Sequence, residues 1–202
     1  MDSPPPLLYD TYYHIYNRGN NRENIFIQER NYEHFLNLYA KYIEPVAETF
    51  AYCLLRNHFH ILVRIRAEDE IDQILKISKT FKVWNPSRNF SDFFNAYAKA
   101  INNAYGRTGS LFQHPFGHVL VSNERQFWKV IAYIHQNPQK HKFVEDFRGW
   151  KWSSYGLILS EKPTRLQRDK VLEWFGDRQQ YMDLHACWAT EAENKWFAEE
   201  DV

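Results

Sequence analysis

Apolar runs with the alternation of β-strands predict a small sheet. Residues 11–17 are rich in aromatic and β-branched side chains and end at the turn-like segment 18–21. Residues 50–55 and 58–65 are two further strand-like runs, and the two residues between them suit a tight antiparallel hairpin. A short run at residues 117–121 predicts a fourth strand.

Apolar positions at helical spacing predict helices between these strands. They cover residues 31–43, 68–83, 91–105 and 123–137. Asn85-Pro86-Ser87 is expected to separate the second helix from the third. Pro138 is expected to end the fourth, because proline disfavours the helical conformation of the residue before it.

The order of these elements predicts an α+β fold, with a ferredoxin-like antiparallel sheet covered by helices. We expect residues 1–156 to form this domain. Residues 157–202 are expected to be a helical C-terminal extension that ends in an acidic tail.

Composition is that of a folded protein with a mildly basic body. The 202-residue chain is 17% aromatic and has a formal net charge of zero. Five acidic residues and one lysine give residues 191–202 a charge of −4, so the rest of the chain carries +4. The zero total therefore hides a mildly basic body and an acidic end that could be disordered or could screen a binding face.

Cysteine usage and the N-terminal residues favour a cytoplasmic protein. Cys53 and Cys187 are the only cysteines, too few for a disulfide framework or a four-thiolate zinc site. The opening residues lack the basic and apolar regions of a secretory signal, and no window is long and apolar enough for a membrane span. We expect a cytoplasmic protein.

The segment His58-Phe59-His60 is a candidate metal site. In a strand, side chains two residues apart project from the same face, so the two imidazoles would lie side by side while Phe59 faces the core. A third protein ligand must then come from elsewhere in the fold. The alternative is that two histidines lie beside a hairpin turn without binding a metal.

The last predicted helix offers further polar groups on one face. Tyr133 and Asn137 are four residues apart and are therefore neighbours on a helix, and Lys129 extends the same face. The apolar stripe of this helix points elsewhere. Tyr133 and Asn137 could then face a ligand, although a tyrosine at such a position is more often a packed surface aromatic.

Five segments together resemble the successive signature blocks of the REP-associated tyrosine transposases, which are one-tyrosine HUH enzymes similar to IS200 transposases. They occur in the order found in that family and cover most of residues 10–156. The segments are YHIYNRGNNRENIF (13–26), YCLLRNHFHILVRI (52–65), GSLFQHPF (109–116), YIHQNPQKHKFV (133–144) and WKWSSY (150–155).

This resemblance implies a role for each residue of the candidate site. His58 and His60 would be metal ligands, Tyr133 the nucleophile and Asn137 the residue that completes the metal site. The position of Asn137 is often glutamine in related one-tyrosine enzymes, so Gln136 is the alternative third ligand.

The chemistry so implied is metal-dependent transesterification of single-stranded DNA. A tyrosine has an unperturbed pKa near ~10, so Tyr133 needs activation by its electropositive surroundings, with Lys129 as a candidate helper. Attack on DNA would give a 5′-phosphotyrosine and a 3′-hydroxyl, and the ester could be resealed without ATP. Mg²⁺ or Mn²⁺ is the expected ion.

The resemblance also implies single-stranded or hairpin DNA as partner, with extragenic palindromic repeats as the source of the hairpins. The chain could act as a monomer or a homodimer. In a bacterial cytoplasm it would be associated with the nucleoid when bound to DNA. The candidate phosphate contacts are basic residues near the signature blocks: Arg18, Arg22, Lys140, Lys142, Arg148 and Lys151.

Three other functions remain open at this point. The chain could be a catalytically inactive hairpin-DNA-binding protein on the same fold, or an interaction protein in which the histidines are incidental. It could also be a metal-dependent hydrolase that uses water in place of tyrosine.

Overall fold

The sheet of the protein is four-stranded and antiparallel. The computed structural model describes residues 5–78 and 85–190, and the strand order is β2-β3-β1-β4. The strands are β1 (Tyr12–Arg18), β2 (Ala47–Leu54), β3 (His58–Ile65) and β4 (Gly117–Val121). All four predicted strands are present close to their predicted positions.

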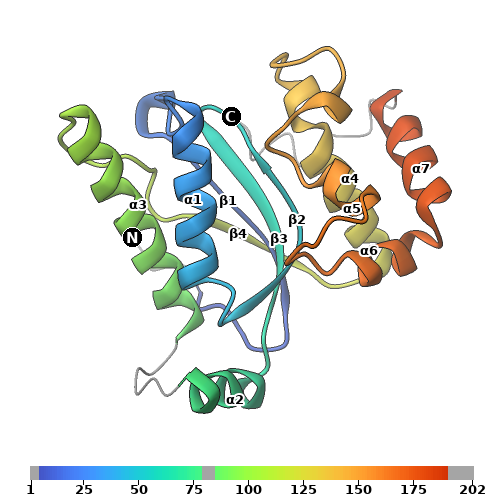
Figure 1. Cartoon of the computed structure of the whole chain (residues 1–202), viewed down its shortest axis with the longest axis horizontal. Coiled ribbons are helices and arrows are strands. Elements are labelled where there is room, and N and C mark those ends of the chain that lie inside the picture. The colour runs from blue at the N-terminus through green and yellow to red at the C-terminus, as the bar shows by residue number, and fades with distance from the viewer. Residues whose placement is uncertain (1–4, 79–84, 191–202) are drawn as a thin grey trace.

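Helices cover both faces of this sheet (Figure 1). Helices α1 and α3 lie on one face, α4 lies on the other with α5 to α7 outside it, and α2 lies beyond one end of the sheet. Their bounds are α1 (Glu29–Tyr42), α2 (Glu68–Ser78), α3 (Pro86–Tyr105), α4 (Glu124–Lys140), α5 (Tyr155–Leu159), α6 (Arg168–Phe175) and α7 (Arg178–Thr190).

The connectivity confirms the predicted α+β, ferredoxin-like class. The elements β1, α1, β2, β3, α3 and β4 follow one another as a β-α-β-β-α-β unit, and β1 and β3 occupy the centre of the sheet. Helix α2 is an addition between β3 and α3. The unit places the middle strands under helices on both faces.

Strand β3 divides its side chains between two cores. Phe59, Ile61 and Val63 belong to the cluster under α1 and α3, whereas Leu62 belongs to the cluster under α4. Full burial of an apolar side chain of this size stabilises the fold by about 1.5–3 kcal/mol. This alternation leaves His58 and His60 on the α4 face.

Two proline positions differ from prediction. Helix α3 begins at Pro86, and the Asn85 side chain caps it by accepting a bond from the Arg88 amide, because proline suits the first helical position. Helix α4 continues through Pro138 to Lys140. Proline there withholds one bond in the last turn, so it does not end the helix.

Two segments that follow α4 pair with the outer edge of β2, one just before the C-terminal extension and one within it. The Ser154 amide donates to the Tyr52 carbonyl over 2.9 Å, and the Gln167 amide donates to the Thr49 carbonyl over 2.8 Å. An uncovered edge strand invites pairing with other chains. The two segments therefore protect one side of the sheet.

Residues of the extension also share the core of α4. Val171, Phe175 and Tyr181 are buried in one cluster with Phe127 and Ile131. The described part of the extension, residues 157–190, thus packs directly on the sheet domain. The acidic tail, residues 191–202, lies outside the described residues.

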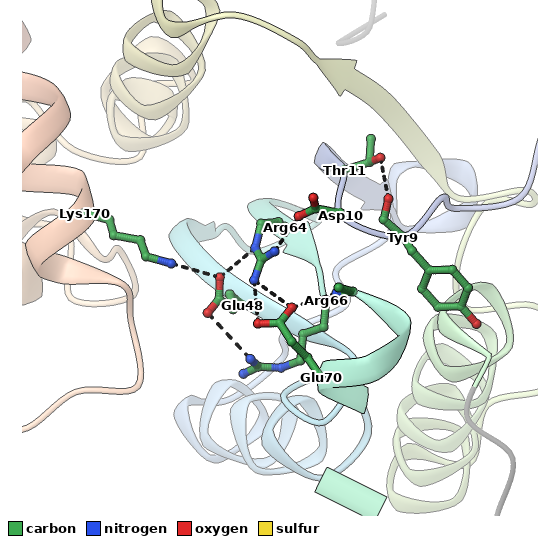
Figure 2. A network of polar contacts seen from close by, with 9 residues as sticks. Tyr9, Asp10, Thr11, Glu48, Arg64, Arg66, Glu70 and Lys170 are labelled. Carbon is green, nitrogen blue, oxygen red and sulfur yellow. Dashed lines mark hydrogen bonds and ion pairs between the residues drawn. The ribbon is translucent and has the colours of Figure 1, made fainter. Parts of the chain in front are cut away.

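An ionic network holds the end of the sheet opposite to His58 (Figure 2). Arg64 contacts the carboxylates of Glu48, Asp10 and Glu70, and Lys170 of α6 reaches Glu48 over 3.4 Å. Burial alone would raise the pKa of the Glu48 carboxyl. The hydrogen bond from Arg64 and the charges of the neighbouring cations together lower this pKa by more than burial raises it, so the net shift is downward. Six strand positions, about 20 Å, separate Arg64 from His58, so this network is structural.

No helix among residues 5–78 and 85–190 has the length and apolarity required to cross a membrane.

Candidate active site

Two histidines of β3 lie side by side on the face that α4 covers. The ring centroids of His58 and His60 are 5.3 Å apart, and the residues are only 4% and 2% exposed. Phe59, between them, is fully buried in the opposite core. The strand alternation used in the sequence prediction is therefore present in the structure.

Helix α4 runs along this histidine pair. The Tyr133 ring lies edge to face with His60, at 5.4 Å between centroids, and the His141 ring lies in the same way 4.7 Å from His58. Tyr133 and His141 are eight residues apart on one helical face. The tyrosine and both imidazoles therefore meet within a single chain.

Asn137 lies midway between these two contacts along the helix. It is one turn from Tyr133 and one turn from His141, so its side chain belongs to the face that covers the histidines. It is fully buried, and its amide donates to the Tyr133 carbonyl over 3.0 Å. Its buried side-chain oxygen has no hydrogen-bond partner among the described residues.

The Nδ1 atom of each histidine is held by a neighbour. His58 Nδ1 lies 2.8 Å from the Asn57 side-chain oxygen, and His60 Nδ1 lies 3.0 Å from His14 Nε2. An amide oxygen only accepts, so His58 carries its proton on Nδ1 and its lone pair on Nε2. A hydrogen bond at one ring nitrogen that leaves the other for the ion is the usual arrangement of metal-binding histidines.

These residues fit a divalent ion. Two imidazole nitrogens and one amide oxygen form a donor set that manganese, magnesium or related ions accept. Within residues 5–78 and 85–190, no three His, Cys, Asp or Glu side chains are grouped so that they could hold a metal. A site of the predicted kind therefore depends on the oxygen of Asn137 in addition to His58 and His60.

A lysine lies over the ring of Tyr133, although it is not the lysine that the sequence indicated as its helper. The Lys140 ammonium is 4.9 Å from the Tyr133 ring centroid. Lys129 is half-buried one turn before Tyr133 on α4. Lys140, predicted as a DNA contact, is thus also a candidate to stabilise negative charge on the phenol.

Tyr133 is enclosed, with only 1% of its surface exposed. Lys140 and the rings of His14 and His60 lie around it. A phosphate can reach the phenol only after some of the surrounding side chains move. In this structure the Tyr133 side chain is therefore shielded from solvent.

The alternative third ligand, Gln136, has a different place. Its amide donates to the His185 carbonyl of α7 over 2.7 Å. Neighbouring residues on a helix point about 100° apart, so Gln136 and Asn137 serve different faces. The side chain of Gln136 is therefore directed toward α7. Asn137 is the amide that lies on the helix face toward the histidines.

His135 joins Gln136 in fastening α7. His185 Nδ1 lies 2.7 Å from the Tyr181 carbonyl and must donate to it, so His185 Nε2 accepts from His135 Nδ1 over 2.9 Å. His135 Nε2 in turn accepts from the Ser154 hydroxyl over 2.7 Å. Burial lowers the pKa of His135 well below its usual value, and it lowers that of His185 to about 4.

Four of the six basic residues predicted to contact DNA lie at the His58 end of the sheet. Arg18 is opposite His58 in the register of β1 and β3, and Arg22 follows in the adjoining 3-10 turn. Lys140 and Lys142 flank His141 at the end of α4. These cations form a basic rim beside the histidine pair.

The other two predicted DNA contacts are engaged with carboxylates. Arg148 pairs with Asp146 over 2.6 Å and lowers the pKa of that carboxyl. Lys151 pairs with Glu29 and also lies over the Trp152 ring. Both side chains are exposed, so these pairs are weak, and DNA contact by Arg148 or Lys151 stays a prediction.

Sequence reasoning missed two histidines of the site. His14 bonds to His60, and His141 packs on His58. Strand alternation places His14 on the same face as Tyr12 and Tyr16, but only the register with β3 shows that it meets His60. His141 continues the four-residue spacing of Tyr133 and Asn137, a signal that was lost when Pro138 was taken as the helix end.

Comparison with known proteins gives a family match across the site. The family model described as "Transposase IS200 like" matches residues 7–137, which include both β3 histidines, Tyr133 and Asn137. A curated protein of Haemophilus influenzae, named as a REP-associated tyrosine transposase, is 28% identical over 112 residues. The match spans 54% of this chain and 58% of that relative, little more than half of its length.

A solved structure shares the fold. It is described as a REP-associated tyrosine transposase bound to a REP hairpin, and it aligns with a TM-score of 0.60 at 15% identity. The alignment covers 81% of this chain and 88% of the other. At this identity the likeness establishes the architecture alone.

Proposed function

Because the chain belongs to the IS200-like transposase family, we propose that it cleaves and rejoins single-stranded DNA with Tyr133 as the nucleophile. The observation that carries this proposal is the position of Tyr133. Its ring lies 5.4 Å from that of His60, and Asn137 is one turn away on the same helix. A nucleophile and a candidate metal site are therefore adjacent in one chain.

The reaction is an exchange of phosphate esters. The Tyr133 oxygen attacks the phosphorus, the bond to the 3′-oxygen breaks, and the phenol proton leaves to solvent while the departing oxygen takes one up. The products are a 5′-phosphotyrosine and a 3′-hydroxyl. Attack by a 3′-hydroxyl on the phosphotyrosine reverses the step, so joining requires no nucleotide cofactor.

Positive charge at the site supports this chemistry. His58, His60 and Asn137 would hold a Mg²⁺ or Mn²⁺ ion, which when bound offsets the charge that develops on the phosphate oxygens. The Lys140 ammonium lies over the Tyr133 ring and favours the phenolate. Tyr133, Lys140 and the ligand residues thus have separate roles.

Hairpin DNA is the proposed substrate. The solved structure with the same fold is described as bound to a REP hairpin, and the relative from Haemophilus influenzae bears the name REP-associated. In this chain Arg18, Arg22 and Lys142 lie beside the histidine pair, where they could follow a phosphate backbone. The rim would lead the strand toward the enclosed tyrosine.

The test is the formation of a covalent protein–DNA adduct. The protein is incubated with Mn²⁺ and single-stranded DNA that contains a REP-type hairpin. The DNA carries its label 3′ of the cleavage site, in the fragment that would stay linked to Tyr133 through its 5′-phosphate. The products are then separated under denaturing conditions. Wild type is expected to carry the label, and Tyr133→Phe is expected to lose it while still binding the hairpin. Tyr9→Phe is the matched control, because it removes an exposed phenol beside Asp10 of the ionic network, at the opposite end of the sheet from His58.

The same experiment separates the alternative functions. Equal labelling of wild type and Tyr133→Phe would show that another residue is the nucleophile. Cutting without any adduct would indicate hydrolysis by water. Hairpin binding that is unaffected by EDTA, with no cutting under any condition, would identify an inactive DNA-binding protein.

A further inference from the structure

His14 is an unassigned histidine at the centre of the site. It lies in β1, is fully buried, and is opposite Leu62 of β3 in the sheet register. Tyr16, two residues later on the same face, is the residue opposite His60. His14 therefore reaches His60 diagonally across the two strands, and their rings stack at 5.1 Å between centroids.

The bond between these two histidines has two forms that differ in the tautomer of His60. The 3.0 Å contact joins His14 Nε2 to His60 Nδ1, and one proton lies between the two nitrogens. When the proton belongs to His60, the lone pair of that ring is on Nε2. When it belongs to His14, the neutral His60 ring carries its proton on Nε2, which then has no lone pair for an ion.

The first form is the one that agrees with the proposed metal site. His58 is already fixed with its proton on Nδ1 by the Asn57 oxygen. Donation from His60 Nδ1 to His14 would give both ligand histidines the same tautomer. The Asn57 amide oxygen at His58 and the His14 imidazole at His60 would then each accept the Nδ1 proton of a ligand histidine.

His14 also contacts the proposed nucleophile. Its ring lies edge to face with Tyr133, at 5.9 Å between centroids, while His60 lies 5.4 Å from the same tyrosine. The three rings form a closed triangle. A change at His14 therefore reaches both the ligand and the nucleophile without contact with the reacting atoms.

We propose that His14 is a positioning residue, which accepts the Nδ1 proton of His60 and so holds the ring and tautomer through which His60 binds a divalent ion. This inference rests on the proposed function, because it needs the metal site. It goes beyond that function by assigning a task to a residue of β1.

The first test compares two substitutions that differ in their ability to accept a hydrogen bond. In His14→Gln the side-chain oxygen can accept from His60, whereas in His14→Leu a side chain of similar size cannot. The dissociation constant of Mn²⁺ is measured on the full chain without DNA, from the electron paramagnetic resonance signal of the free ion. Folding of each variant is checked by circular dichroism.

We expect His14→Leu to bind Mn²⁺ about 10–100-fold more weakly than wild type, the usual effect of losing a partner of a ligand histidine. His14→Gln should recover most of this loss. His118→Leu is the matched control, because His118 is a half-buried histidine of β4 that packs on Tyr13 on the α1 and α3 face of the sheet. It should bind Mn²⁺ like wild type.

A second measurement needs no substitution. Long-range nitrogen–proton correlation spectra report which nitrogen of a neutral histidine carries the proton. We expect His60 of the wild-type protein, free of metal, to carry it on Nδ1. This result would hold even if His14→Leu failed to fold.

Each outcome decides the inference. A folded His14→Leu with wild-type affinity, a His14→Gln as weak as His14→Leu, or a His60 proton found on Nε2 would each overturn the role of His14 alone. Wild-type protein that binds no Mn²⁺ would overturn the proposed metal site together with this inference.

Discussion

At the scale of single residues, Gln136 and Asn137 of α4 are adjacent amides that face different elements, α7 and the sheet. Gln136 donates to the His185 carbonyl of α7, while Asn137 lies on the helix face toward the histidines. The side-chain oxygens of both residues have no hydrogen-bond partner among the described residues. A buried polar atom without a partner is unfavourable by about 1–3 kcal/mol. A bound ion would remove this penalty at Asn137.

Replacing these amides one at a time should therefore have different effects. Asn137→Ala is expected to weaken Mn²⁺ binding at least tenfold, because it removes one of three proposed ligands. Gln136→Ala should leave Mn²⁺ binding unchanged and lower the free energy of unfolding by about 1–2 kcal/mol, through the lost bond to α7. Calorimetric titration with Mn²⁺ and urea unfolding measure the two effects. The reverse result would make Gln136 the ligand.

The two lysines of α4 provide a second comparison. Lys140 lies over the Tyr133 ring, and Lys129 lies one turn before it. We expect Lys140→Ala to slow single-turnover DNA cleavage about two- to fivefold, since Lys140 is exposed and a cation over an aromatic ring at an exposed site contributes about 0.5–1 kcal/mol. Lys129→Ala should have a smaller effect. A larger loss in Lys129→Ala would restore Lys129 as the residue that activates the tyrosine.

At the scale of elements, the attachment of α7 to α4 depends on two neutral histidines. His135 and His185 share a hydrogen bond and are fully buried, with Ser154 and Tyr181 as their other partners. Protonation of either ring would place a charge in this apolar region and break the chain of bonds. The contact between these helices is therefore sensitive to acid.

The pH dependence of stability follows from the lowered pKa of His185. Its pKa is about 4 in the folded protein and near ~6.5 in the unfolded chain, so the unfolded state binds more protons between these values. Stability is complete above pH 6.5 and decreases as the pH falls toward 4. Between pH 7 and pH 5 the expected loss from this residue is about 2 kcal/mol.

Urea unfolding of wild type and His185→Gln at these two pH values tests this expectation. The variant should lose clearly less stability than wild type on acidification, because one of the two titrating groups is absent. His34→Gln, at an exposed position of α1, should behave like wild type. Equal losses in wild type and His185→Gln would show that the histidine pair does not control the acid response.

The pattern of the sequence predicted most elements but not the contacts between them. The alternation from Phe59 to Val63 identified β3 and the face of its histidines, because one side of the strand is an apolar core. The ends of α3 and α4 were misjudged at Pro86 and Pro138, where proline fits the first or the last turn of a helix. The bond from His14 to His60 depends on strand register, which no local pattern contains.

At the scale of the whole molecule, the site is assembled from segments that are far apart in the sequence. β1 and β3 lie under the site and α4 covers it (Figure 1). The segments after α4 are held to α4 through α7 and to the sheet through the edge of β2. The ionic network around Arg64 secures the opposite end of the sheet. The extension therefore supports the site from outside.

Tyr133 and the histidine pair meet within one polypeptide, and this has a genetic consequence. A mixture of Tyr133→Phe and His58→Ala chains should show no complementation. One variant lacks the nucleophile and the other lacks a metal ligand, and neither chain can supply the missing residue to the other. If exchange of α4 between two copies were required, mixed dimers would regain one working centre and the mixture would form the covalent adduct. From the contact of Tyr133 with His60 we therefore expect each polypeptide to act as a self-sufficient unit, with its own tyrosine and its own histidines.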